Sequence, residues 1–352
     1  MMKWNGKTIR QIRNGYFSAR YFLRTQEVLI SQNNWSHVTM QVFQKRNHAV
    51  LCGIEEVKSL LKTACGIYRD GKWKSMWKKL TVDSLQDGDI VSPYEPVMHI
   101  TGPYLAFVHL ESLYLGILAR RTLVATNSRL VMDAVKGKPV YFFADRFDHF
   151  LNQDGDGYAA HIGGISGVCT QAHASWWEGE AIGTMPHAFI AVCHGDTAKA
   201  AGLFLEKFPH IPLVVLVDFH NDCVQTTLEV ARAFGNKLWG IRLDTSESMK
   251  DRSFRDDSTD SNFGVCPALV YAVRRALDRE GFGHVKIIVS GGFTEEKIKN
   301  FENEHVPVDG YGVGSALLKG NNDFTADVVK VDGKLLAKVG RKFQENNRMR
   351  LV

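Results

Sequence analysis

The sequence lacks several patterns that mark specialised classes of protein. Its six cysteines form no CxxC pair, which argues against a zinc knuckle and a disulfide framework. The HxH and HExxH spacings of metal sites and the GxSxG turn of a serine nucleophile are also absent. No run approaches the ~18 apolar residues of a membrane span. We therefore expect reduced thiols, no metal site built from protein ligands alone, and no membrane partner.

The charge balance is mild. The chain carries 43 basic and 38 acidic residues, a formal charge of +5, which is too small an excess to indicate a nucleic-acid partner. Residues 1–17 are basic but have no apolar core, so they do not resemble a secretory signal. These features predict a cytoplasmic protein.

Two regions of different pattern follow each other along the 352 residues. Residues 1–110 mix short strands with helices, expected at 16–31 and 54–64, and read as a small α/β module. The tail, 325–352, is expected to return to that module. Residues 111–324 begin with a long helix and then alternate strands with helices. Such alternation predicts a parallel sheet with crossover helices, most simply a (β/α) barrel.

The barrel strands are expected where short apolar runs occur. These runs are 139–144, 181–184, 213–218, 238–244, 286–291 and 309–314. Functional side chains of such a barrel belong at the carboxyl ends of its strands.

Two of these strands end in glycine turns. Gly291 and Gly292 precede a helix with Thr294 as its predicted N-cap, and Gly314 with Ser315 opens the next helix. Glycine lets a backbone approach a ligand closely, and helix starts present unpaired N–H groups to anions. The turns therefore favour a phosphate site, although two ordinary strand-to-helix turns would have the same sequence.

The residues that follow the other strands are dominated by charge. Arg146 and Arg242 suit a carboxylate or phosphate, while Asp218 and Asp244 suit ribose hydroxyls or Mg²⁺. Structural ion pairs would explain these residues equally well. His187 begins an apolar helix and could transfer a proton or a phosphoryl group, or could simply satisfy a backbone carbonyl.

Five motifs then occur in a diagnostic order. They are GTMPHAF, VDFHND, GIRLDTSE, IIVSGGF and GYGVGSAL. Their order is similar to that of the nicotinate phosphoribosyltransferases, within the type II phosphoribosyltransferases that include the quinolinate and nicotinamide enzymes. Early stretches such as EPVMHITGPY and the late VDGKLLAKVGR also resemble that family, so the likeness covers nearly the whole chain.

The resemblance implies an irregular (β/α) barrel beside the N-terminal module, and a homodimer with shared active sites. It implies transfer of phosphoribose from phosphoribosyl pyrophosphate to nicotinate in NAD salvage, with Mg²⁺ and with ATP that phosphorylates His187. The resemblance also implies roles for single residues. The catalytic residues would be His187 and Asp244, and the phosphate-binding residues would be Gly291, Gly292, Gly314 and Ser315. The substrate-binding residues would be Tyr21, Phe143, Arg146, Ser166, Arg121, Arg242 and Asp218.

Two other functions stay open. The same fold could transfer phosphoribose to quinolinate or nicotinamide, a choice that depends on basic side chains such as Arg120, Arg121 and Arg146. It could also serve a non-catalytic nucleotide-binding protein, because fold alone does not establish function.

Overall fold

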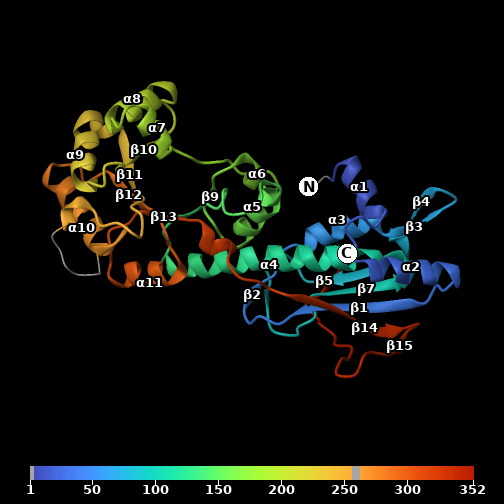
Figure 1. Ribbon diagram of the computed structural model, residues 1–352. Coiled ribbons are helices and arrows are strands. Elements are labelled where there is room, and N and C mark those ends of the chain that lie inside the picture. Colours follow the sequence, from blue (N-terminus) through green and yellow to red (C-terminus); the bar gives the residue numbers. More distant parts are fainter. Residues whose placement is uncertain (1–3, 256–261) are drawn as a thin grey trace. The chain divides into compact units, whose positions relative to one another are not determined.

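The computed structural model describes residues 4–255 and 262–352, and its contacts group into two units (Figure 1). The first unit runs up to Thr126 and includes Gly320–Val352; the second is Asn127–Lys319. The domain boundaries predicted at 110 and 324 stay predictions, because grouping by contacts does not test which segments fold independently.

The first unit is built on an antiparallel sheet. Its strand order is β15-β14-β1-β7-β5-β16. The helices of this unit are α1 (Gly6–Arg13), α2 (Arg20–Ser31), α3 (Ile54–Ala64) and the first part of α4 (Glu111–Ala134). Its strands are β1 (His37–Gln44), β2 (Ala49–Val50), β3 (Gly66–Arg69), β4 (Lys72–Ser75), β5 (Thr81–Ser84), β6 (Ile90–Val91), β7 (Met98–Pro103), β14 (Phe324–Val331), β15 (Lys334–Leu335) and β16 (Arg350–Leu351).

The central strand of this sheet is β1, which is buried on both faces after its first residue. Apolar side chains from β1, α3 and the start of α4 form one core beneath the sheet, including Val42, Leu60 and Tyr114. The helix predicted at 54–64 is confirmed. The helix predicted at 16–31 is four residues shorter, because Gly15 turns the chain with φ 71° before α2 begins.

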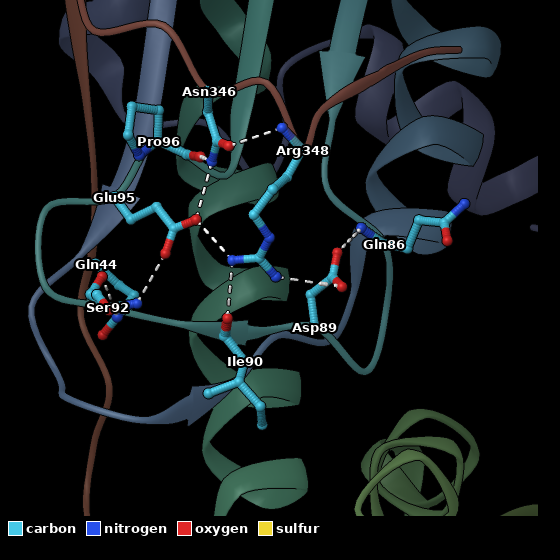
Figure 2. Close-up of polar contacts among 9 residues, drawn as sticks. All are labelled: Gln44, Gln86, Asp89, Ile90, Ser92, Glu95, Pro96, Asn346 and Arg348. Atoms are coloured by element: carbon cyan, nitrogen blue, oxygen red, sulfur yellow. Dashed lines mark hydrogen bonds and ion pairs between the residues drawn. The ribbon is translucent and has the colours of Figure 1, made fainter.

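The C-terminal tail belongs to this unit, as the sequence predicted. Strand β14 pairs antiparallel with β1 from Phe324 to Val331 (Figure 1). Farther on, the Arg348 guanidinium lies 2.8 Å from a carboxylate oxygen of Glu95 and 3.4 Å from Asp89. Asn346 donates to the same Glu95 carboxylate at 3.0 Å (Figure 2). These polar contacts hold the tail against the loop before β7.

The second unit is built on a six-stranded, all-parallel sheet. Its strand order is β10-β11-β12-β13-β8-β9. The strands are β8 (Val140–Phe142), β9 (Gly167–Val168), β10 (Leu213–Leu216), β11 (Leu238–Leu243), β12 (Lys286–Val289) and β13 (Gly310–Val313). The helices are α5 (Gln153–Ile162), α6 (Gln171–Ala174), α7 (His187–Val192), α8 (Thr197–Lys207), α9 (Cys223–Phe234), α10 (Pro267–Arg279) and α11 (Glu295–Asn303). This curled parallel sheet confirms the α/β class and the irregular barrel.

One predicted strand is wrong. In the segment 181–184 only Ala181 pairs, through an isolated parallel bridge to Val168. The side chains of residues 181–183 are exposed, so this segment has no buried face that would hold it in a ladder. The ring of strands is therefore irregular between β9 and β10, and the sequence analysis missed the two-residue β9.

Candidate active site

The carboxyl ends of the parallel strands bring most of the predicted residues to one edge of the sheet. Phe143 follows β8, Asp218 comes two residues after β10, and Asp244 follows β11. The glycine turns follow β12 and β13. Because parallel strands end at the same edge, residues separated by more than 170 positions in the chain lie at one mouth.

A histidine and a carboxylate form the first pair at this mouth. His187 is the first residue of α7, and its Nε2 lies 3.0 Å from both carboxylate oxygens of Asp218. Asp218 is nearly buried, whereas the His187 side chain is 40% exposed. The hydrogen bond to Asp218 raises the pKa of His187, with Asp244 adding to the effect, while burial and Arg242 oppose it. A carboxylate only accepts hydrogen bonds, so Nε2 carries the proton.

A partly buried arginine forms the second part of the site. The Arg242 guanidinium lies 5.4 Å from the centre of the Phe143 ring, a cation–π arrangement. Its Nε is buried and has no hydrogen-bond partner in the described residues. Burial lowers the pKa of Arg242, and the nearby Asp244 and Asp218 act in the opposite direction. A buried donor without a partner on a partly buried cation is a feature that an anionic ligand would satisfy.

The first glycine turn lies against the strand that carries Arg242. Gly291 and Gly292 have φ values of 84° and 68°, a region that favours glycine. Asp244 accepts a 2.7 Å hydrogen bond from Ser290, the residue before the turn. Thr294 caps α11 by accepting from the N–H of Lys297, so the predicted N-cap is confirmed.

The second glycine turn lies under an aromatic wall. A Cβ at Gly314 would lie 2.5 Å from the Phe147 ring and 2.8 Å from the carbonyl oxygen of Phe143. Gly314 is followed by a short 3-10 helix, Ser315–Leu318, where the sequence predicted a helix without specifying its type. Arg146 is exposed and lies over the Phe147 ring at 5.7 Å.

Three predicted residues are not among the strand ends of this mouth. Ser166 lies at the opposite, amino-end edge of the sheet, where its hydroxyl accepts from the N–H of Val140 at 3.2 Å. Tyr21 and Arg121 belong to the first unit. Tyr21 is 62% exposed on α2, and Arg121 forms a 2.8 Å ion pair with Glu56.

The mouth also contains residues that the sequence analysis missed. Cys169, directly after β9, donates to Asp145 at 3.2 Å, and burial raises the pKa of its thiol to about 12, so it is no thiolate nucleophile. Lys297 and Glu247 flank the first glycine turn. Had β9 been predicted, Cys169 would have been found by its position after a strand.

Within residues 4–255 and 262–352, no three His, Cys, Asp or Glu side chains cluster as a metal site would require. Over the same ranges, none of the helices has the length and apolar character needed to cross a membrane. Asp218 and Asp244 are the carboxylates at the mouth that could contribute to holding a cation.

Comparison with known proteins gives relatives of this chain. The family described as "Quinolinate phosphoribosyl transferase, N-terminal domain" matches residues 20–122. A solved nicotinate-nucleotide pyrophosphorylase from Pyrococcus furiosus is 33% identical, with a TM-score of 0.81, and the match covers 100% of this chain and 85% of that one. Human nicotinic acid phosphoribosyltransferase, 16% identical, shares the fold over 90% of this chain and 75% of its own, with a TM-score of 0.68.

Curated relatives give the same picture at lower coverage. The nicotinate phosphoribosyltransferase pncB1 of Mycobacterium tuberculosis is 28% identical over 261 residues, which are 72% of this chain and 54% of that protein. The chain thus spans about half the length of the curated relatives it matches. The fold is that of the phosphoribosyltransferases built on an irregular barrel. Within that class, the chain belongs to the nicotinate phosphoribosyltransferase family.

Proposed function

We propose that this protein is an enzyme that joins nicotinate to phosphoribosyl pyrophosphate, giving nicotinate mononucleotide and pyrophosphate in NAD salvage. The observation that carries the proposal is the Arg242 guanidinium, stacked on Phe143 with a buried, unused donor, beside two glycine turns at one strand edge. A partly buried cation next to an aromatic face suits an anionic aromatic substrate and its phosphorylated co-substrate.

The proposed reaction forms a bond between C1 of the ribose and the pyridine nitrogen while the bond from C1 to the pyrophosphate oxygen breaks. Positive charge develops on the ribose as pyrophosphate leaves, so positioning and electrostatics supply most of the catalysis. Phe143 stacks on the pyridine ring and Arg146 binds its carboxylate. Arg242 and Asp244 bind the phosphoribosyl group, and the turns at Gly291 and Gly314 bind phosphate.

ATP coupling through His187 belongs to the same proposal. Because Asp218 holds the proton on Nε2, the Nδ1 lone pair is the nucleophile that would take a phosphoryl group. No hydrogen bond occupies Nδ1 among the described residues. Mg²⁺, which prefers a few carboxylates together with substrate phosphates, would be held by Asp218 or Asp244 and would neutralise charge on the leaving group.

We further propose a cytoplasmic homodimer whose active sites combine residues of both subunits. The support is the exposure of aromatic side chains on one segment of the first unit: Tyr16, Phe17 and Tyr21 are 71%, 49% and 62% exposed. Large exposed aromatic groups commonly mark a surface that a partner covers.

Transfer to quinolinate is the second candidate, since the Pyrococcus relative and the matched N-terminal family carry names compatible with it. Quinolinate has one more carboxylate and needs a further cation. Arg121, a candidate for that role, already forms an ion pair with Glu56 at 2.8 Å. This pairing favours nicotinate.

The test incubates the purified protein with Mg²⁺, phosphoribosyl pyrophosphate and, separately, nicotinate, nicotinamide or quinolinate, with and without ATP. We expect nicotinate mononucleotide and pyrophosphate, with a yield that ATP increases. His187→Ala should remove that increase, whereas His210→Ala, an exposed histidine of the same unit, should retain it. Product from another base would refute the nicotinate assignment, and stable binding without turnover would indicate a nucleotide-binding protein.

A further inference from the structure

The first glycine turn presents a charge problem if it binds phosphate. A Cβ at Gly291 would lie 3.4 Å from a carboxylate oxygen of Asp244, and one at Gly292 would lie only 1.7 Å from Oε1 of Glu247. Two carboxylates therefore border the turn directly. At such short range they repel a phosphate dianion unless a cation compensates for them.

Lys297 lies where that cation is needed. It is the third residue of α11, and its side chain leans back toward the helix start, as helical side chains do. Its Nζ lies 3.5 Å from the carbonyl oxygen of Gly291 and 4.5 Å from the centre of the Phe293 ring.

The charge of Lys297 is only partly satisfied. Its side chain is half-buried, yet no carboxylate of residues 4–255 and 262–352 comes within 4.0 Å of its Nζ, the distance at which ion pairs are counted. Burial lowers the pKa of Lys297, and Glu247 acts in the opposite direction from farther away. A half-buried ammonium without a carboxylate at ion-pair distance in the described residues has donors beside the glycine turn that an anion could accept from.

We propose that Lys297 is the cation that binds the ribose 5′-phosphate at the Gly291-Gly292 turn, and that the Glu247 carboxylate on Gly292 weakens this binding. The proposal rests on the function proposed above. It adds a charged residue to the predicted phosphate site, which otherwise consists of backbone groups and Ser315. Lys297 contributes affinity for the phosphate; it takes no part in bond breaking.

The test is calorimetric titration with ribose 5-phosphate, without base or ATP, so that binding is measured apart from turnover. We expect Lys297→Met to weaken binding about tenfold or more, as loss of a charged hydrogen bond does. Lys297→Arg should restore most of the affinity. Lys299→Met is the matched control, since Lys299 lies on the same helix, is exposed, and pairs with Glu295; its affinity should equal that of the wild type.

Glu247→Gln provides a second, independent test that does not rely on the folding of the lysine variant. Removing this carboxylate should tighten binding about two- to fivefold, the effect of a partly exposed charge. Wild-type affinity in Lys297→Met, or unchanged affinity in Glu247→Gln, overturns the inference while leaving nicotinate turnover, assayed separately, to support the proposed function. Wild-type protein that binds ribose 5-phosphate but transfers it to no base retains the inference and removes the proposed function. Wild-type protein that does not bind it overturns the inference, and the separate turnover assay then decides the proposed function.

Discussion

Gly312 lies inside β13 directly against the aromatic wall of the site. A Cβ at this position would lie 2.5 Å from both Cδ2 and Cε2 of Phe143 and 3.1 Å from Cβ of Ser290. Ordinary carbon contacts are about 3.5–4.0 Å. In Gly312→Ala the Phe143 ring must therefore move about 1 Å, and overpacking of this kind costs about 1–3 kcal/mol of folding free energy.

The same movement should disturb ligand binding. The centre of the displaced Phe143 ring lies 5.4 Å from the Arg242 guanidinium, and this ring is the proposed stacking face for the pyridine. Misplacement by about 1 Å costs as much as 100-fold in rate. We expect Gly312→Ala to raise the KM for nicotinate and lower kcat/KM by about tenfold or more, with stability measured in parallel by urea unfolding.

Two comparisons make this prediction specific. Gly183→Ala is the matched control, because a Cβ there meets no atom within 4 Å, so its stability and KM should equal those of the wild type. Adding Phe143→Leu to Gly312→Ala removes the ring and should recover stability without recovering nicotinate binding. A Gly312→Ala protein with wild-type stability and KM would refute the reasoning that Phe143 is held rigidly at the mouth.

Three further predictions concern single hydrogen bonds. Asp218→Asn removes the main cause of the raised pKa of His187, so that pKa should fall. In the proposed mechanism neutral imidazole is the nucleophile, so the acid limb of the ATP-stimulated rate should move to lower pH. An unmoved NMR titration of His187 would contradict this. Tyr311→Phe removes a 2.5 Å hydrogen bond to the buried Glu302. It should lower the free energy of unfolding, measured in urea, by about 1–3 kcal/mol. A midpoint equal to that of the wild type would show that Glu302 does not need this donor. Thr294→Ala should cost about 0.5–2 kcal/mol through loss of the α11 cap, while Thr294→Ser, which keeps the hydroxyl, should lose far less.

The parts of the fold that could be predicted are those determined by local sequence. Strands β10 to β13 are short apolar runs followed by polar or glycine residues, and all four occur where the runs predict them. The segment 181–184 has the same composition as a strand, but its exposure depends on which neighbours reach it. Tertiary contacts decide whether such a segment forms a strand, so the apolar run alone could not predict the outcome.

The residues at the mouth also fall into those that the sequence predicts and those that it does not. Asp218, Arg242 and Asp244 were found because a parallel sheet brings every strand end to one edge. Glu247 and Lys297 were missed because they reach the glycine turn from neighbouring elements, the loop after β11 and the first turn of α11. The lysine was within reach of prediction, since a side chain in the first turn of a helix leans toward the preceding loop.

Two cations at the mouth, Arg242 and Lys297, lack an ion-pair partner in the described residues, which supports the proposed anionic ligand. Arg242 and Lys297 are partly or largely withdrawn from water, and the pKa of each is lowered by that burial. Neither has a carboxylate within ion-pair distance in the described residues. The nearby carboxylates have other partners: Asp218 accepts a hydrogen bond from His187, and Asp244 accepts one from Ser290. Burying a cation without a carboxylate partner costs free energy. An anionic ligand that pairs with these cations would offset that cost, so the proposed site favours a substrate with several negative charges.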